Sequence, residues 1–402
     1  MSGKTKIEGP LSSITVLDLT RVLAGPWCTR LLKDLGAKVI KVEPPGGDVT
    51  RTFGHRIRDP TSKTTSSTYF ATVNNGKECI CLDLKHVTDR KVFEQLMLRS
   101  DVLVENYRPG VMERLGFTWE WIHQKNPQLV YCRISGYGQS GPLSNLGALD
   151  TIIQAGSGIL AATGHPGDGL GGNVRAGVAV SDILAGVYAA NAIQAGIISR
   201  YKTKVGSMID ISMQDCSIAS ACVPLSQYGG SGKNPELLGN RNPVSAPFDV
   251  YQCRDGKQLV ICAAKTKDWH LLCQVLKLYH LPGDPRFNTF TKRVKNQEAL
   301  SVELTLGTLR YECDDLLEKL RKLKIPCGPV NKASDIAVDP HVQARKMVIK
   351  TEDRKFLVTG NPFKFSSFPD MVTNIRPSPS TLNGDETSIL QFISKTPVKA
   401  KL

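Results

Sequence analysis

The residue best placed to do chemistry is Asp182, which ends the segment NVRAGVAVSD (173–182) just before a long apolar stretch. Asp is a preferred helix N-cap, so one interpretation is a cap alone. The N–H groups at the start of a helix favour negative charge, and we therefore expect this carboxylate to stay ionised at neutral pH. A carboxylate in a Gly-rich loop that a substrate can approach closely is also suited to act as a nucleophile.

Other chemistries have weaker support in the sequence. Gly136–Gly141 matches the dinucleotide pattern G-x-G-x-x-G, but Pro142 and a polar loop follow it where that pattern needs a helix. We therefore predict no nicotinamide cofactor. The 7 histidines are dispersed, and the 11 cysteines contain no Cys-x-x-Cys pair. We expect no metal site and reduced cysteines in a reducing compartment.

The elements around Asp182 predict an open α/β sheet. Residues 14–19 and 37–43 read as strands, and Pro26 and Gly36 mark the start and end of the helix between them. Strand-like and helix-like runs then alternate as far as residue 135, and a long helix is expected over 183–202. Such alternation is typical of a Rossmann-like parallel sheet with helices on its faces.

A second, smaller α+β domain is expected over residues 226–329. The composition changes near Gln227, where a loop is predicted over 228–243. A hairpin with its turn at Asp255–Gly256 and helices at 268–279 and 297–323 come next. The large domain would then comprise residues 1–225, completed by 330–402.

Bulk composition excludes several classes of protein. The chain has 402 residues, of which 41% are hydrophobic and 22% charged, as expected for a globular protein of two domains. No uninterrupted apolar run approaches the roughly 20 residues of a membrane span, and no secretory signal is recognisable. The net charge of +14 favours phosphate-bearing partners. The basic residues are spread and aromatics make up only 6%, so nucleic acid is not expected.

Seven segments, in order and over most of the chain, resemble the class III CoA-transferases (the CaiB/BaiF family). They are LDLTRVLAGPWCTRLLKDLGAKVIKVEPPGGDVTR (17–51), VNNGKECICLDLK (73–85), VENYRPGVMERLGF (104–117), SGYGQSGP (135–142), RAGVAVSDILAG (175–186), YKTKVGSMIDISM (201–213) and IPCGPV (325–330). The resemblance implies an enzyme in which Asp182 is the nucleophile and carries coenzyme A as an aspartyl-CoA thioester. It also implies acyl-CoA and carboxylic acid substrates, no permanently bound cofactor, and an interlocked homodimer with active sites between the subunits.

The resemblance also implies contacts for coenzyme A in loops after strand ends, where α/β sheets bind ligands. Lys85 and Arg114 would suit the phosphates, Tyr107 would pack on the adenine, and Asp150 would face the nucleophile. Gly229–Gly232 is either a flexible lid or an ordinary loop between domains. The full set of expected contacts is Leu23, Ala24, Leu82, Lys85, Asn106, Tyr107, Arg108, Arg114 and Asp150.

Alternative activities stay open at this point. Racemases of the same family carry Gly-His-Asp where this chain has Ala148-Leu149-Asp150, so the His base is missing. A thioesterase and a non-enzymatic CoA-binding protein are further alternatives. Arg175 lies before the nucleophile as it does in family members that use dicarboxylates. It indicates a short dicarboxylate as acceptor and succinyl-CoA as donor.

The chain ends in Ala400-Lys401-Leu402, which resembles the peroxisomal address Ser-Lys-Leu. No mitochondrial transit peptide is visible. We therefore expect a peroxisomal location, with mitochondrion and cytoplasm as the alternatives.

Overall fold

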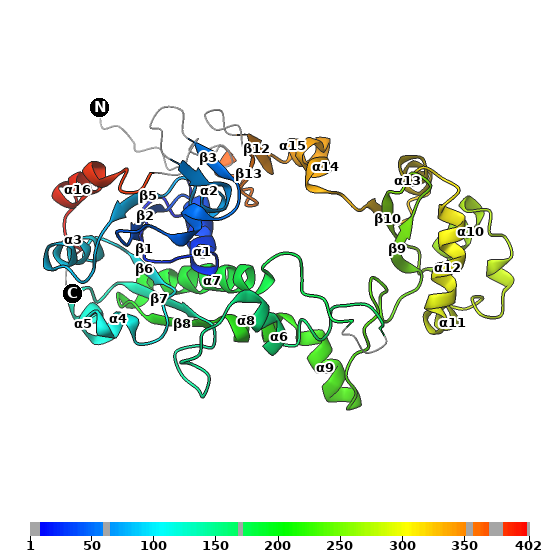
Figure 1. The fold of residues 1–402 in the computed structure, drawn as a ribbon, viewed down its shortest axis with the longest axis horizontal. Helices are drawn as coiled ribbons and strands as arrows, with labels where there is room; N and C mark the ends of the chain where they lie inside the picture. The colour runs from blue at the N-terminus through cyan, green and yellow to red at the C-terminus, as the bar shows by residue number, and fades with distance from the viewer. Residues whose placement is uncertain (1–8, 59–64, 168–171, 351–356, 370–380, 400–402) are drawn as a thin grey trace. The chain divides into compact units, whose positions relative to one another are not determined.

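The computed structural model describes residues 9–58, 65–167, 172–350, 357–369 and 381–399 (Figure 1). The chain forms two compact units. The first comprises Met1–Leu160, Arg175–Gly232 and Asp339–Leu402, and the second Ala161–Val174 and Lys233–Val338. The second unit shares most of its length with the predicted small domain and in addition takes in residues 161–174. Ala400-Lys401-Leu402, on which the predicted location rests, lies outside the described residues.

A six-stranded sheet forms the centre of the first unit, with all neighbouring strands parallel. Its order in space is β5-β2-β1-β6-β7-β8, so the chain winds outward from β1 in one direction and then, from β6, in the other. This order is the doubly wound one, and it confirms the predicted parallel α/β sheet. The strands are β1 Thr15–Asp18, β2 Lys38–Glu43, β5 Glu78–Cys81, β6 Val102–Glu105, β7 Val130–Ser135 and β8 Met208–Ser212.

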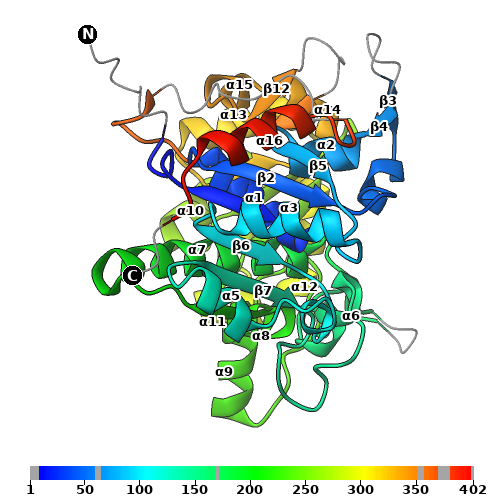
Figure 2. The same ribbon diagram turned by 90° about the vertical axis from the view of Figure 1, so that its left-hand side faces the viewer.

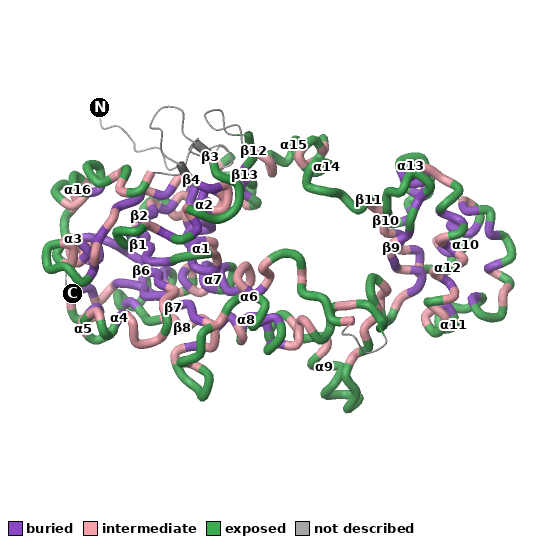
Figure 3. Tube along the Cα trace, in the orientation of Figure 1, coloured by how far each residue is buried: buried purple, intermediate pink, exposed green. Residues whose placement is uncertain are grey.

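Successive side chains of a strand point to opposite faces of a sheet. In this sheet apolar side chains point to both faces, and each face belongs to its own hydrophobic core. Val16 belongs to the core that includes helices α1 and α7, and Leu17 to the core that includes α3. Figure 3 shows the buried strands between these helices. The helices of this unit are α1 Ala24–Asp34, α2 Thr68–Asn74, α3 Val87–Met97, α4 Val111–Arg114, α5 Trp119–Lys125, α6 Asp150–Gly156, α7 Val180–Thr203, α8 Met213–Ser220, α9 Cys222–Ser231, α15 Pro340–Ala344 and α16 Glu386–Lys395.

The C-terminal part of the chain closes one edge of the sheet. Asn383 and Asp385 accept hydrogen bonds from the backbone N–H groups of Cys81 and Cys79 at 2.8 and 2.9 Å. Helix α16, drawn in red in Figure 2, follows directly. Side chains thus occupy donors that β5, as an edge strand, would otherwise expose. Two-stranded sheets complete this unit: β3 Arg56–Arg58 with β4 Thr65–Ser67, and β12 Val348–Lys350 with β13 Leu357–Thr359.

The second unit is built on an antiparallel sheet in the order β11-β10-β9. Its strands are β9 Phe248–Gln252, β10 Gln258–Cys262 and β11 Cys327–Pro329, and the predicted hairpin between β9 and β10 is confirmed. The buried side of the sheet packs on helices α10, α12 and α13. The helices of this unit are α10 Thr266–Val275, α11 Phe290–Lys295, α12 Gln297–Thr308, α13 Cys313–Lys322 and α14 Ala333–Val338.

Two predicted elements are wrong. The single helix expected over 297–323 is two helices, α12 and α13, separated at residues 309–312. The loop expected from residue 228 onward begins later, because Gly229–Ser231 form the last turn of α9 and Gly232 ends the helix with a positive φ of 68°. The glycines of the suggested lid are therefore part of a helix and its cap.

Helix α7 has the length and mean hydropathy of a membrane span, the single such helix in the described part of the chain. Polar residues such as Asn191 and Gln194 interrupt this helix, so the sequence shows no unbroken apolar run of that length. Its buried residues, among them Ala185, Ala189 and Ile193, belong to the core shared with α1 and the sheet. Packing inside the unit accounts for these residues of α7, while Val187, Tyr188, Ile198 and Tyr201 stay exposed.

Candidate active site

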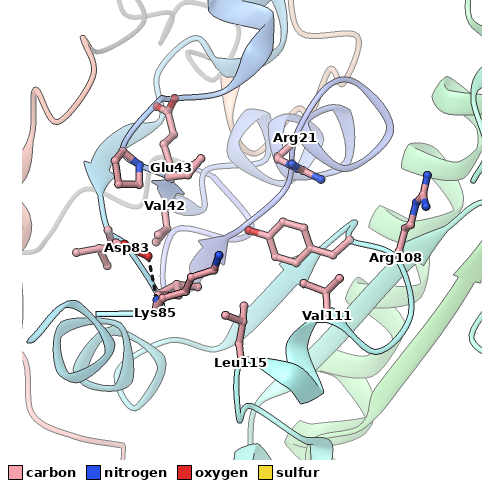
Figure 4. A pocket seen from close by; sticks show the side chains of 13 residues that line it. Arg21, Val42, Glu43, Asp83, Lys85, Arg108, Val111 and Leu115 are labelled. Atoms are coloured by element: carbon pink, nitrogen blue, oxygen red, sulfur yellow. Dashed lines mark hydrogen bonds between the residues drawn. The ribbon is translucent and has the colours of Figure 1, made fainter. Parts of the chain in front are cut away.

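A pocket of about 350 Å³ lies at the carboxyl ends of the strands on one side of the sheet (Figure 4). Its walls come from the loops after β1, β2, β5 and β6. The winding of the chain reverses between β1 and β6, and such a switch point is where doubly wound sheets bind ligands. The lining residues are Arg21, Val42, Glu43, Pro44, Pro45, Leu82, Asp83, Leu84, Lys85, Tyr107, Arg108, Val111 and Leu115.

Cations surround this pocket. Arg21, Lys85 and Arg108 come from three different loops and are exposed, and none of them forms an ion pair with a described residue (Figure 4). The Arg21 guanidinium lies 5.1 Å from the centre of the Tyr107 ring. Glu43, the nearest buried carboxylate, is already paired with Arg51 at 2.6 Å. The pocket therefore presents positive charge and an aromatic side chain to an anionic ligand with a planar group.

Four of the nine expected coenzyme A contacts gather here. Leu82, Lys85, Tyr107 and Arg108 line the pocket, while Arg114 does not. Asn106 joins two of the loops, because its side chain exchanges hydrogen bonds of 2.7 Å with the backbone N–H and C=O of Arg21. The sequence reasoning missed Arg21. Its place directly after the first strand, in the motif that contains Leu23, is the signal that could have found it.

Two buried lysines hold the turn between β1 and α1 in place. Lys77 lies entirely inside the unit and donates to Asp18 and to the Pro26 carbonyl, each at 3.0 Å. Lys41, equally buried, donates to the Thr20 carbonyl at 2.6 Å. These bonds hold the turn at both ends and so set the direction of the first N–H groups of α1.

Asp182 lies in the first turn of α7, but it is not the N-cap. Ala179 occupies the cap position, and Asp182 is the third helical residue. Its carboxylate accepts a hydrogen bond from the backbone N–H of Ala24, the first residue of α1. The prediction that Asp182 caps its own helix and is thereby kept ionised is wrong. The helix start that stabilises its charge belongs to α1.

Asp150 performs the capping instead. It begins α6, and its Oδ1 accepts the N–H groups of Ser181 at 2.8 Å and Asp182 at 3.4 Å. Its Oδ2 accepts from the Gln154 side chain at 2.6 Å. The sequence placed Asp150 among the coenzyme A contacts, but it does not line the pocket at the strand ends. The structure brings it to the N-terminus of α7.

The two carboxylates therefore differ in environment. Asp150 has three N–H donors that stabilise its negative charge. Burial and the Asp150 charge raise the pKa of Asp182 to about 7, and the Ala24 N–H offsets this only in part. A carboxylate that is poorly solvated and has few donors is the more basic and more nucleophilic member of such a pair.

A smaller cavity of about 230 Å³ is lined in part by Tyr69, a residue that interacts with the Asp182 charge. Leu23, the residue before Ala24, lines this smaller cavity. It does not line the larger pocket, where four of the other predicted contacts gather. Burial together with the Asp182 and Asp150 charges raises the pKa of the Tyr69 phenol to about 12. The complete lining of the smaller cavity is Leu23, Gly54, Thr68, Tyr69, Thr72 and Val73.

Two further predicted features are placed by the structure. Arg175 is exposed on the loop before α7, and its guanidinium donates to the Ala176 carbonyl at 3.1 Å. Within the described ranges, His, Cys, Asp and Glu side chains form no group of three or more able to hold a metal ion.

Comparisons with known proteins all point to one family. The model of CoA-transferase family III matches residues 11–384. An acetyl-CoA:oxalate CoA-transferase from Acetobacter aceti is 42% identical, and the alignment covers 91% of each chain. A succinyl-CoA:glutarate CoA-transferase from Homo sapiens is 35% identical, covering 96% of this chain and 86% of the human one. A solved CaiB/BaiF family protein from Brucella suis has a TM-score of 0.88 at 34% identity, covering 96% and 100% of the two chains.

Proposed function

The chain belongs to CoA-transferase family III, and from this we propose that it moves coenzyme A from succinyl-CoA to a short dicarboxylic acid through an aspartyl-CoA intermediate on Asp182. Membership of the family makes the chain a CoA-transferase enzyme. The observation that carries the proposed mechanism is the partly buried Asp182 carboxylate, whose pKa is raised to about 7 and which faces the Ala24 N–H.

The proposed reaction exchanges one activated acyl bond for another. Asp182 attacks the donor thioester carbonyl, the carbon–sulfur bond breaks, and a mixed anhydride and CoA thiolate form. The thiolate then attacks the Asp182 carbonyl and releases the donor acid, leaving aspartyl-CoA. The acceptor carboxylate attacks this thioester and again releases thiolate. That thiolate finally takes the acceptor acyl group and regenerates Asp182, so the covalent route divides one transfer into easier steps.

The residues of the site suit these steps. An anion develops on the carbonyl oxygen at each attack, and the start of α1 presents N–H groups to this region through Ala24. Arg21, Lys85 and Arg108 would bind the phosphates, with Tyr107 against the adenine. The apolar cavity that Tyr69 lines would keep water from the anhydride, which hydrolyses readily.

The acceptor is proposed to be a short dicarboxylate. Both relatives named above join coenzyme A to a dicarboxylic acid, oxalate in one and glutarate in the other. The cavity that Tyr69 lines is small, and Arg175 on the loop before α7 would pair with the second carboxylate of such an acid. Donors differ between the relatives, so acetyl-CoA is tested beside succinyl-CoA.

We further propose a homodimer of interlocked chains and a peroxisomal location, with mitochondrion and cytoplasm as alternatives. The dimer is supported by the exposed apolar side chains of α9 and the location by the terminal Ala-Lys-Leu alone. No part of the proposed chemistry calls for nucleic acid or a membrane.

Trapping the intermediate tests the mechanism. The enzyme is incubated with succinyl-CoA, then treated with hydroxylamine or borohydride, and the modified peptide is identified by mass spectrometry. We expect the adduct on Asp182, its absence in Asp182→Ala, and formation of glutaryl-CoA or oxalyl-CoA when the acid is added. Normal CoA binding without an adduct would contradict the covalent role. Release of free CoA without acceptor-CoA would indicate a thioesterase, and exchange of the succinyl-CoA α-hydrogens with solvent deuterium would indicate the proton transfer of a racemase.

A further inference from the structure

Gln154 is a buried polar residue on α6 to which no role has been assigned above. Its side chain has no exposed surface, and it lies one helical turn after Asp150. The amide is used at both ends. Its Nε2 donates to Asp150 Oδ2 at 2.6 Å, and its Oε1 accepts from the Ala176 N–H at 2.9 Å. A glutamine that donates at one end and accepts at the other fixes its own orientation.

These bonds extend into a chain that spans the segment before α7. From the Ala176 N–H the chain passes through Gln154 to Asp150, and from Asp150 to the N–H groups of Ser181 and Asp182. Both ends of the segment 176–182 are thus tied to one helix, α6. Ser181 is fixed a second time, since its hydroxyl accepts from Ser217 on α8 at 3.0 Å.

We propose that Gln154 is a positioning residue for the reaction. Its amide holds the Asp150 carboxylate in the orientation that caps α7 beside Asp182, and at its other end it holds the turn after Arg175. The inference rests on the proposed role of Asp182. It assigns two separable effects to one side chain. The donor end governs the state of Asp182, and the acceptor end governs the placement of Arg175 toward the acid.

Few charged groups face this network. Helix α6 packs on α7 and α8, whose nearest titratable side chains are Asp182, Asp215 and Cys216. Tyr69 on α2 interacts with both Asp150 and Asp182. Arg30 on α1, which packs on α7, is engaged with Asp34 and backbone carbonyls. Among the charged groups near Asp182, Asp150 therefore has the largest effect on the protonation of its carboxylate.

The test uses isotope exchange, which needs a single acid. Labelled succinate is mixed with succinyl-CoA and the full-length enzyme, and entry of label into succinyl-CoA is followed against pH. A parallel series uses acetate with acetyl-CoA. Wild type should exchange label in at least one series and Asp182→Ala in neither. Failure at this stage would count against the proposed function, and the Gln154 variants are compared only after it succeeds.

Gln154→Met keeps the length of the side chain and removes both hydrogen bonds. We expect kcat to fall about 10- to 100-fold and KM for the acid to rise about tenfold, since two partly buried partners lose their bonds. Arg175→Ala serves as the reference for the KM effect alone. Wild-type kcat, KM and pH profile in Gln154→Met would overturn the inference.

Gln154→Glu separates the two ends. The new carboxylate still accepts from Ala176, so KM for the acid should stay near wild type. It donates to Asp150 only while the two carboxyls share a proton. Activity should therefore be close to wild type at low pH and decline at higher pH, where the wild-type rate is at its plateau. A profile parallel to wild type would contradict the role of the donor end.

A reciprocal exchange guards against variants that merely fail to fold. In Asp150→Asn alone, two amide groups face each other and one hydrogen bond is lost. In the double variant Asp150→Asn, Gln154→Glu the bond is restored with its direction reversed, and the negative charge moves away from Asp182. We expect the double variant to exceed Asp150→Asn about tenfold, with its pH midpoint below that of wild type. Equal activity of the two would overturn the inference.

Discussion

The raised pKa of Asp182 links the activity of this residue to the stability of the protein. Burial and the Asp150 charge raise that pKa from 3.8 to about 7. The folded chain therefore binds a proton that the unfolded chain releases. This proton's contribution to stability is fully present below the unfolded pKa near 3.8 and is lost as pH rises through about 7. Above that pH the ionised nucleophile destabilises the fold.

Asp182→Asn should accordingly stabilise the protein while abolishing the transfer. Asparagine is neutral at every pH and still accepts the Ala24 N–H. We expect the gain in unfolding free energy to be about 1–2 kcal/mol larger near pH 8 than near pH 5, allowing for partial solvent access. Urea unfolding of both proteins at the two pH values measures it. Glu298→Gln, at an exposed position in the first turn of α12, is the control and should show a small loss of equal size at both. A pH-independent gain for Asp182→Asn would contradict the raised pKa.

At the residue scale, the sequence singled out Asp182 as a candidate but did not predict its environment. The segments around Asp182 point to it, and four of the nine predicted coenzyme A contacts gather in one pocket because they follow strand ends. The capping of α7 by Asp150 and the bridge through Gln154 join residues 22 to 32 positions apart. Such bonds depend on how α6 packs against α7, which local patterns in the sequence do not encode.

At the scale of elements, the contact between α1 and α7 sets the geometry around Asp182. Gly186 lies one turn after Asp182 on the same face of α7. A Cβ added there would lie 2.7 Å from the Ala24 carbonyl oxygen and 2.9 Å from Cδ1 of Trp27. The glycine therefore lets the first turn of α1 approach closely enough for the Ala24 N–H to reach Asp182.

Gly186→Ala should separate the two helices. Alanine raises helix propensity by about 1 kcal/mol, yet backbone atoms oppose the new methyl group, so we expect a net loss of about 1–3 kcal/mol. The exchange rate should fall at least about tenfold as Ala24 moves from Asp182. Thermal unfolding and the exchange assay measure the two effects.

Gly196→Ala on the same helix is the matched control. Its Cβ would meet side-chain atoms alone, the methyl groups of Val130 at 3.1 Å and Ile209 at 3.4 Å and the hydroxyl of Ser207 at 3.6 Å, which are able to shift. We expect activity near wild type and little change in stability. If both variants behaved alike, the close approach of α1 would have no bearing on the reaction.

Element prediction succeeded where the periodicity was strong and failed at termini. The strands expected over 14–19 and 37–43 match β1 and β2, and the alternation expected as far as residue 135 ends there with β7. A loop was predicted where α9 ends, because Gly229 and Gly230 disfavour a helix in isolation. The break between α12 and α13 falls within an apolar pattern that continues on both sides, so periodicity alone does not reveal it.

At the scale of the whole molecule, α9 points to a second copy of the chain. None of its residues is buried, and Val223 and Leu225 are 70% and 59% exposed. Most helices are stabilised by packing of an apolar face, which α9 lacks in the single chain. A homodimer in which the second chain covers α9 would supply this packing. We expect light scattering to give about 88 kDa, twice the 43.9 kDa of one chain. A monomeric mass would contradict the dimer.

Interlocking makes a stronger prediction than dimerisation, because threaded chains cannot separate while folded. Tagged and untagged homodimers mixed at low concentration should exchange no subunits, and mixed dimers should appear only after joint unfolding and refolding. Leu225→Glu should lower the unfolding temperature by weakening the covered face, whereas Val302→Glu, at a 59% exposed position on α12, should not. Rapid exchange without unfolding would contradict interlocking and leave an ordinary dimer. Because exchange through unfolding passes through the separated chain, its rate should follow the unfolding rate of the protein as temperature is raised.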